Sequence, residues 1–310
     1  MTENSFIVQA AKREAAPITA AFIGQSGSGK TYSALLFARG LVGATGKIVV
    51  IDTEGKRALI YADDPDIGSF HHIDFGLPYS SNRYKEAVLA AVMADADAII
   101  IDSASHEHEA EGGMIDFAEK EELRLKNRRD KSRAKWIKPK TEHNRFVRYA
   151  VGCPAHVIFC IREKVVADMD NPNNKQGLLM PVCEKNLMFE MTITLRLEPE
   201  THKATFMKVP KPFEKHITNG EVLTVEHGRK LLTVSMTGEE LDKEYQKQLT
   251  ICNDVSAMGM ERLQLHWSTL STEMKTMLKD DLDSKFKPIA AQADSDPKLL
   301  EECDDDAKDD

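Results

Sequence analysis

The sequence predicts an α/β fold with a mainly parallel sheet, an antiparallel β extension and a C-terminal helical segment. Three observations support this fold class. Apolar, partly β-branched runs that are typical of buried strands alternate with helical segments through the first half of the chain. Past Arg162 the apolar runs become short and alternating, as in antiparallel strands. From about Gly238 onward, apolar residues recur at a spacing of three and four, as in helices.

The elements of the first half follow one another at a regular pitch. Buried strands are expected at residues 18–24, 47–55, 71–75, 97–103 and 155–161, and helices at 31–42, 80–96 and 143–152. Strands separated by helices in this way favour a parallel sheet. Further along, antiparallel strands are expected at 191–198, 203–210 and 221–236, after a turn-rich loop at 171–177.

The composition favours a protein of the cytoplasm. No apolar run approaches the roughly 20 residues that cross a membrane, and the polar start is unlike a secretory signal. The five cysteines form no Cys-x-x-Cys pair, which argues against structural zinc and suits a reducing compartment. We therefore expect a cytoplasmic protein without membrane contact.

The net charge of −9 is unevenly distributed along the chain. Residues 294–310 carry nine acidic and two basic side chains, in a tail with too few apolar residues to order itself. Residues 120–148 carry twelve Lys or Arg against four acidic residues, a net charge of +8. Such a block is either a solvated helix face or a surface that binds nucleic acid.

The stretch GQSGSGKT, Gly24–Thr31, has the pattern G-x-x-x-x-G-K-[ST] of a phosphate-binding loop. Its small residues allow consecutive backbone N–H groups to surround a phosphate at a helix N-terminus. In this motif Lys30 reaches the β- and γ-phosphates and Thr31 ligates Mg²⁺. The motif follows an expected strand and opens an expected helix, so we expect nucleotide contacts from Gly24, Gln25, Ser26, Gly27, Ser28, Gly29, Lys30 and Thr31.

Two carboxylates are candidates for the chemistry of a bound nucleotide. Asp102 ends the apolar run AIIID, where an acidic partner of a phosphate-bound Mg²⁺ is expected. Glu54 follows the strand after the phosphate-loop helix. It either orients the water that attacks the γ-phosphate, if the two strands are neighbours, or is a surface glutamate beside a turn.

An ordered series of segments resembles the RecA-like ATPases, and among them the compact phage-encoded ATPases of recombination and single-strand annealing. KIVVIDTEGKRALIYADD resembles the strand with the catalytic glutamate, DAIIIDSAS the magnesium-site strand, and HNRFVRYAVGCPAHVIFCIREK the helix and strand that end in a γ-phosphate sensor. NPNNKQGLLMPVCEKNLMFEMTITLRLE resembles the mobile DNA-binding loop and the next core strand. The resemblance covers residues 17–198 and implies an ATPase core there. The residue pattern adds an N-terminal extension at 1–16, a β extension at 199–236, a helical segment at 237–291 and an acidic disordered tail at 292–310.

The resemblance also implies roles for single residues. It implies catalytic roles for Lys30 and Glu54. It implies that Thr31 and Asp102 bind magnesium and that Tyr61 stacks on adenine. Arg162 stands where RecA has glutamine, so it either senses the γ-phosphate, faces a neighbouring subunit, or is structural. Lys185 lies close to the position where the family has cationic residues that reach the next subunit's ATP. This implies a nucleotide contact by Lys185 in a homo-oligomer. The cofactors implied are ATP and Mg²⁺.

The basic block falls between the magnesium strand and the sensing strand, where RecA-like proteins carry their first DNA-facing loop. Lys and Arg there would neutralise phosphates of single-stranded DNA. Trp136 either stacks on a base or covers the edge of the core. The DNA-binding residues expected are Lys126, Arg128, Arg129, Lys131, Arg133, Lys135, Trp136, Lys138, Lys140 and Lys175.

Two further features have alternative interpretations. His106 and His108 lie two residues apart without a further clustered ligand, which rarely forms a metal site. Glu107 between them could instead assist the attacking water. The acidic tail could compete with DNA for the basic block, in which case removal of residues 294–310 would raise DNA affinity at low salt.

The function expected is that of a phage ATPase that binds single-stranded DNA, hydrolyses ATP with stimulation by DNA, and promotes annealing or strand exchange. A homo-oligomer and a single-strand-binding or replication protein are the partners expected. One alternative is a small-molecule or nucleotide kinase on the same phosphate loop. Another is a nucleotide-gated DNA-binding adaptor with little turnover.

Overall fold

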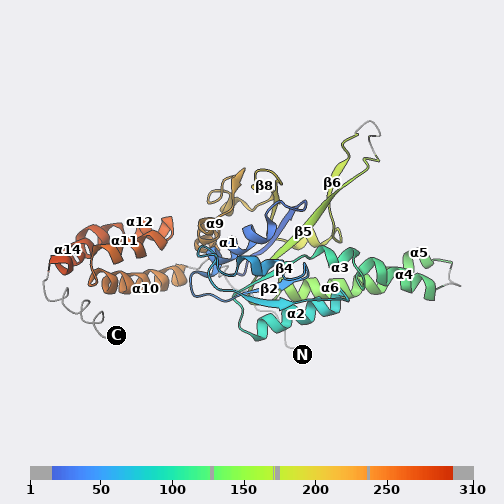
Figure 1. The fold of residues 1–310 in the computed structure, drawn as a ribbon, viewed down its shortest axis with the longest axis horizontal. Coiled ribbons are helices and arrows are strands. Elements are labelled where there is room, and N and C mark those ends of the chain that lie inside the picture. The colour runs from blue at the N-terminus through green and yellow to red at the C-terminus, as the bar shows by residue number, and fades with distance from the viewer. Residues whose placement is uncertain (1–15, 126–128, 170, 172–174, 236–237, 296–310) are drawn as a thin grey trace, which may run out of the picture. The chain divides into compact units, whose positions relative to one another are not determined.

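The computed structural model describes residues 16–125, 129–169, 171, 175–235 and 238–295. The chain forms two compact units. The larger is Pro17–Val234, and the described part of the other consists of residues 16, 235 and 238–295. The larger unit has the α/β fold with a mainly parallel sheet that the sequence predicts (Figure 1).

The sheet has the strand order β3-β2-β4-β5-β1-β7-β8-β9. The strands from β3 to β7 are parallel, and β8 and β9 add an antiparallel edge. β6 pairs antiparallel with the end of β5, and the two form a hairpin that extends beyond the sheet (Figure 1). The strands are β1 Thr19–Gly24, β2 Ile48–Asp52, β3 His71–Asp74, β4 Ala98–Asp102, β5 His156–Val166, β6 Leu178–Pro181, β7 Ile193–Leu197, β8 Lys203–Lys208 and β9 Glu221–Val222.

Helices cover both faces of the sheet. Helices α1 and α9 pack on one face against Ala20 and Phe22 of β1, and α2 and α6 pack on the other against Ala21 and Ile23. A strand that is buried on both sides has no polar face, which explains its continuous apolar sequence. The helical segments of this unit are α1 Lys30–Val42, η1 Arg57–Tyr61, α2 Ser81–Met93, α3 Ser105–Glu109, α4 Met114–Arg124, α5 Lys131–Ala134, α6 Ile137–Val151, α7 Leu187–Glu190, α8 Lys211–Glu214 and α9 Val225–Ser235.

The register of the sheet determines which strand ends lie together. Asp52 of β2 pairs with Asp102 of β4, and Gly24 of β1 pairs with Arg162 of β5. The carboxyl ends of these strands therefore lie along one edge, where ligands bind in open α/β sheets. The phosphate loop, the turn after β2 and the end of β4 all open onto this edge.

The expected strand at 221–236 is wrong over most of its length, because only Glu221–Val222 is a strand and Val225–Ser235 is helix α9. This segment covers one face of the sheet. As a helix, it turns Gly228 and Leu231 toward the core and buries both. The β extension expected at 199–236 thus contains two short helices besides β8 and β9. Helix α6 also begins at Ile137, six residues earlier than expected, and includes part of the basic block.

The smaller unit is helical, as expected from its sequence. Its elements are α10 Gly238–Ser256, α11 Met260–Thr269, α12 Thr272–Met277, α13 Lys279–Asp281, the π-helix η2 Leu282–Phe286 and α14 Lys287–Ser295. It has a small apolar core of its own, formed by Cys252, Leu263, Leu270, Met274, Leu278, Phe286 and Ala290. In the part of the chain that the structure describes, no helix is long and apolar enough to span a membrane. Most of the acidic tail lies outside the described residues.

Candidate nucleotide-binding site

The phosphate loop connects β1 to α1, and the side chain of its lysine binds the backbone of the loop. Gly27 and Gly29 both have φ of 82°, a left-handed conformation that favours glycine. Lys30 is the first residue of α1, and its Nζ donates to the carbonyl oxygens of Gly24 at 2.9 Å and Gln25 at 2.8 Å. Burial lowers the pKa of the Lys30 ammonium. The lysine thus lies inside the loop, where it would meet the phosphates of a nucleotide.

Thr31 and Asp102 meet beside this loop. The hydroxyl of Thr31 donates to Oδ2 of Asp102 at 2.5 Å. Burial raises the pKa of Asp102 to about 6, although the hydrogen bond from Thr31 acts in the opposite direction. A hydroxyl and a carboxylate next to a phosphate-binding loop are the oxygen donors that Mg²⁺ takes when it is shared with a nucleotide. The residues present therefore fit the expected cation.

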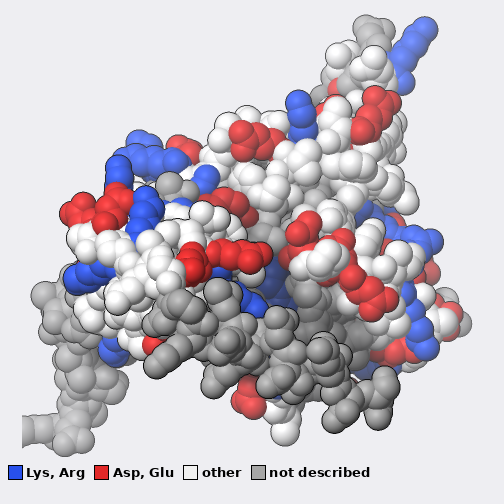
Figure 2. Space-filling view, turned by 60° about the vertical axis from the view of Figure 1, so that its left-hand side comes forward, with Lys and Arg blue, Asp and Glu red and all other residues white. Residues whose placement is uncertain are grey.

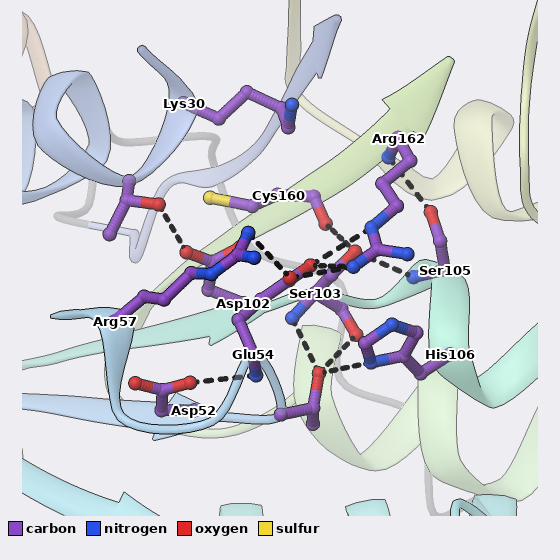
Figure 3. Close-up of polar contacts among 12 residues, drawn as sticks. Lys30, Asp52, Glu54, Arg57, Asp102, Ser103, Ser105, His106, Cys160 and Arg162 are labelled. Atoms are coloured by element: carbon purple, nitrogen blue, oxygen red, sulfur yellow. Dashed lines mark hydrogen bonds and ion pairs between the residues drawn. The ribbon is translucent and has the colours of Figure 1, made fainter. Parts of the chain in front are cut away.

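Glu54 lies in the turn after β2 and is held by two arginines (Figure 3). Arg162 Nη2 lies 2.5 Å from Oε1 and 2.6 Å from Oε2 of Glu54, and Arg162 Nε lies 2.9 Å from Oε1. Arg57 Nη1 lies 3.5 Å from Oε2. The Glu54 side chain is 12% exposed and that of Arg162 is 38% exposed. Glu54 is therefore not a solvated surface residue.

Asp52 positions Glu54, and sequence reasoning missed it. Its buried carboxylate accepts from the backbone N–H of Glu54 at 2.7 Å and of Ala58 at 3.1 Å. His72 Nε2 on the neighbouring strand lies 3.2 Å from the same carboxylate. An aspartate that accepts from the backbone two residues ahead defines an Asx turn. The sequence IDTEG contains that signal, because Asp52 precedes Glu54 at this spacing.

Helix α3 ties the ends of three strands together. Thr53 Oγ1, next to Glu54, accepts from the backbone N–H of Ser103 at 2.8 Å and lies 2.7 Å from His106 Nδ1. Ser105 Oγ accepts from the backbone N–H of Arg162 at 2.8 Å. His106 thus supports the turn that carries Glu54. Among the described residues, no group of three His, Cys, Asp or Glu side chains could hold a metal.

Glu107 points away from this site. It is 2% exposed, accepts a hydrogen bond from Ser81 of α2, and lies 3.0 Å from His143 Nδ1 of α6. It does not line the cavity at the phosphate loop. The expectation that it assists the attacking water is therefore wrong, because the carboxylate is used to join α3 to α2 and α6.

A cavity of about 840 Å³ opens over the phosphate loop. Its size is typical of small-molecule and cofactor sites. Tyr61 lines it and packs on Tyr32, with ring centroids 5.2 Å apart. His202 and Val222 from the β extension also line it, and sequence reasoning missed both, since no motif marks a residue that a distant segment returns to the site. The predicted residues that line it are Ser26, Gly27, Gly29, Lys30, Thr31, Glu54, Tyr61, Asp102 and Arg162.

The other predicted nucleotide contacts lie elsewhere. Gly24 and Gln25 do not line the cavity and accept hydrogen bonds from Lys30 through their carbonyl oxygens, and Ser28 is fully buried. Lys185 does not line this cavity. It lines a second cavity together with Trp136.

The cations of the basic block divide into two groups. Lys135, Lys138 and Lys140 form ion pairs with Glu122 at 2.5 Å, Glu121 at 3.0 Å and Glu184 at 3.2 Å, respectively. Charges of both signs are interspersed on the face shown in Figure 2. Exposed cations of the block that make no ion pair with any described residue include Arg129, Lys131 and Arg133.

The remaining predicted DNA contacts are placed only in part. Lys175 is exposed beside the β5–β6 hairpin and lines a shallow cavity there with Val165 and Met169. Lys126 and Arg128 lie outside the described residues.

Comparisons with known proteins agree with this geometry. The family model of the AAA domain matches residues 16–232, which is more than two thirds of the chain. The match includes the phosphate loop, the Glu54 turn, Asp102 and Arg162. None of the curated proteins matches the chain.

Proposed function

Since this chain belongs to the AAA-domain family and is a P-loop ATPase, we propose that it hydrolyses ATP with Mg²⁺ and couples that cycle to single-stranded DNA. The observation that supports hydrolysis is the position of Glu54. It lies at the same cavity as Lys30, Thr31 and Asp102. A carboxylate beside a phosphate site can orient a water and accept its proton.

Each residue of the site has a distinct task in this proposal. Lys30 binds the β- and γ-phosphates, and Tyr61 packs against the base. Thr31 and Asp102 would hold Mg²⁺, which would neutralise charge on the phosphates when bound. Glu54 accepts the proton of the attacking water.

Arg162 links ATP binding to the state of Glu54. A guanidinium binds a carboxylate and a phosphate with the same forked geometry. The γ-phosphate therefore competes with Glu54 for Arg162, and ATP releases the carboxylate for catalysis. ADP lacks that phosphate and leaves the pair closed.

The proposal for DNA is supported by cations of the basic block that make no ion pair with any described residue, Arg129, Lys131 and Arg133, and by the half-buried Trp136 beside them. Such a surface binds single strands through phosphate contacts and stacking. We propose that the protein acts as a homo-oligomer in phage recombination or replication, alongside a single-strand-binding or replication protein. Its task there is annealing or strand exchange.

The test is the rate of phosphate release from ATP with and without single-stranded DNA. Stimulation by DNA that is lost at high salt supports the proposal. Stimulation by a metabolite, with phosphate transferred to it, would identify a kinase instead. DNA binding that depends on ATP without turnover would identify an adaptor. The Glu54→Gln variant controls for contaminating ATPases, because it should bind ATP without hydrolysing it.

A further inference from the structure

The second cavity of the larger unit has a volume of about 560 Å³ and lies between the helices of the basic block and the segment after β6. One part of its wall is apolar and includes Trp136, Met114 and Ile137. Met114 is buried, whereas Ile137 is 63% exposed. The remaining wall carries charge. Its cationic residues are Arg133, Lys140 and Lys185, and its acidic residue is Glu184.

The charges of this wall leave an excess of positive charge. Glu184 is buried, accepts from the backbone N–H of Asn186 at 2.6 Å, and forms an ion pair with Lys140 at 3.2 Å. Arg133 and Lys185 are exposed and form no ion pair with any described residue. Two cations therefore remain available to an anion that enters the cavity.

We propose that this cavity takes one unstacked base of a single-stranded nucleic acid, with the base on Trp136 and its phosphates on Arg133 and Lys185. The inference rests on the proposed DNA function and identifies the site at which a base of the strand binds. A free phosphate would use the cations but not the apolar wall. A base with its phosphate uses both, and aromatic stacking holds bases of single strands in many proteins.

A double strand does not fit this cavity. Its bases are stacked and paired, and one must be extruded at a cost of a few kcal/mol before it can enter a pocket. A base of a single strand is unpaired, so the free-energy cost of moving it into the cavity is much smaller. The cavity therefore favours single strands by its shape, in addition to its charge.

Helix α3 lies between this cavity and the ATP site. His108 at its end lines the second cavity, and Glu107 holds His143 of α6, the helix that also supplies Ile137 and Lys140 to the wall. On the other side, His106 contacts Thr53 and Ser105 contacts the backbone of Arg162. Helix α3 therefore contacts both the wall of the second cavity and the residues that hold Glu54 and Arg162.

Trp136 itself reports on the proposed site. The chain has two tryptophans, and the other, Trp267, lies in the smaller unit. In a Trp267→Phe background, Trp136 is the sole indole. We expect an oligothymidylate to quench its fluorescence saturably, and to bind at least about fivefold more tightly than an abasic oligomer of the same length and charge. The abasic oligomer keeps the phosphates and lacks the bases.

Variants separate stacking from charge, and their affinities are measured with dye-labelled oligomers because variants of Trp136 lack the indole signal. Trp136→Ala should lower the affinity for oligothymidylate to that for the abasic oligomer, whereas Trp136→Tyr should retain most of the difference, because a phenol ring also stacks. The control is Arg145→Ala, on an exposed residue of α6 that does not line the cavity. This variant should lower the affinity for both oligomers by the same factor. The affinity for the abasic oligomer also shows that the Trp136→Ala protein is folded.

Two outcomes overturn the proposal in different ways. If both oligomers bind equally and Trp136→Ala changes neither affinity, the cavity takes no base, although binding of single-stranded DNA through phosphates still stands. If neither oligomer binds even at low salt, the DNA function itself fails, and the cavity proposal fails with it.

Discussion

Arg162 binds both carboxylate oxygens of Glu54, across 108 residues of sequence, with Nη2 2.5 Å from Oε1 and 2.6 Å from Oε2. Charge-assisted N–H donors of this kind are the strong hydrogen bonds of proteins. Both oxygens of the Glu54 carboxylate are therefore already bound by a charged donor. In the proposed cycle, an anion that binds Arg162 releases Glu54 from this pair.

Replacement of Glu54 by Gln should separate binding from hydrolysis. The amide has nearly the same shape as the carboxylate but cannot accept the proton of water, so the hydrolysis rate should fall by about 10²-fold or more. Affinity for a fluorescent ATP analogue, measured by titration, should be retained or rise, because Lys30 and Thr31 are unchanged and the neutral amide competes less with the γ-phosphate for Arg162. Normal hydrolysis by this variant would show that Glu54 is not the base.

Replacement of Arg162 by Lys should reduce the preference for ATP over ADP. A lysine is a point charge and cannot span two oxygens as the guanidinium does. One hydrogen bond to a charged group contributes about 1.5–3 kcal/mol, so the ratio of the two dissociation constants should fall about tenfold. The ratio is best measured in the Glu54→Gln background, where ATP is not consumed. An unchanged ratio would assign Arg162 a purely structural task.

The cations of the basic block should contribute unequally to DNA binding. Replacement of Arg129, Lys131 and Arg133 together by Ala should lower the slope of log affinity against log salt by about 2, at ~0.7 per phosphate contact with a single strand. Lys135 and Lys138 are a control pair, because each is already paired with a glutamate. Their replacement should change the slope less. If the slope changes by the same amount per removed charge in both sets of variants, paired and unpaired cations contribute equally to DNA binding, and the prediction is wrong.

His156 should make the stability of the larger unit depend on pH. Burial lowers its pKa from 6.5 to about 4, and its Nδ1 accepts a hydrogen bond from the backbone N–H of Ile18 at 2.9 Å. Between these two pH values the unfolded chain binds a proton at His156 and the folded chain does not. The stabilisation is thus complete above pH 6.5 and is lost as the pH falls toward 4, by about 1.4 kcal/mol per pH unit from this residue.

The matched variant is His156→Asn, whose side-chain oxygen can accept the same hydrogen bond and does not titrate. Denaturant unfolding at several pH values should show a shallower loss of stability for the variant between pH 6.5 and 4. Parallel curves for the two proteins would contradict the assignment.

The contact of α1 with α9 should not tolerate a larger residue at Gly228. A Cβ there would lie 2.1 Å from the carbonyl oxygen of Phe37 and 2.9 Å from Cα of Gly40. Backbone atoms cannot move aside as a flexible side chain can, so Gly228→Ala should destabilise the unit by about 1–3 kcal/mol and lower its Tm. Gly220→Ala is unsuitable as a control, because that glycine has φ of 86°. Gly76→Ala is suitable, because its Cβ would meet no atom within 4 Å.

Much of the nucleotide site was predictable because its signals are local. The phosphate loop, Lys30, Thr31 and Asp102 lie in short motifs at strand ends, and the structure brings them together at one cavity. The parallel strands were predictable for a related reason. Burial on both faces leaves an apolar run that the sequence displays directly.

Other features depend on which segments meet, and local pattern does not contain that information. Arg162 reaches Glu54 because β5 and β2 both border β4. Helix α9 packs closely on α1 where Gly228 meets the backbone of Phe37 and Gly40, a contact between distant segments that no local pattern marks. Lys185 lines the cavity of Trp136 because β6 returns along β5.

The sequence by itself thus determined that this chain carries a phosphate-binding loop, and it predicted which residues meet the phosphates of a nucleotide, because glycines and a lysine at fixed spacing define that motif. Only the tertiary structure decided that the Glu54 carboxylate is bound by Arg162, and that Trp136 shares one cavity with two cations that make no ion pair with any described residue. Those contacts join residues far apart in the chain, and they form only when the order of the strands is established.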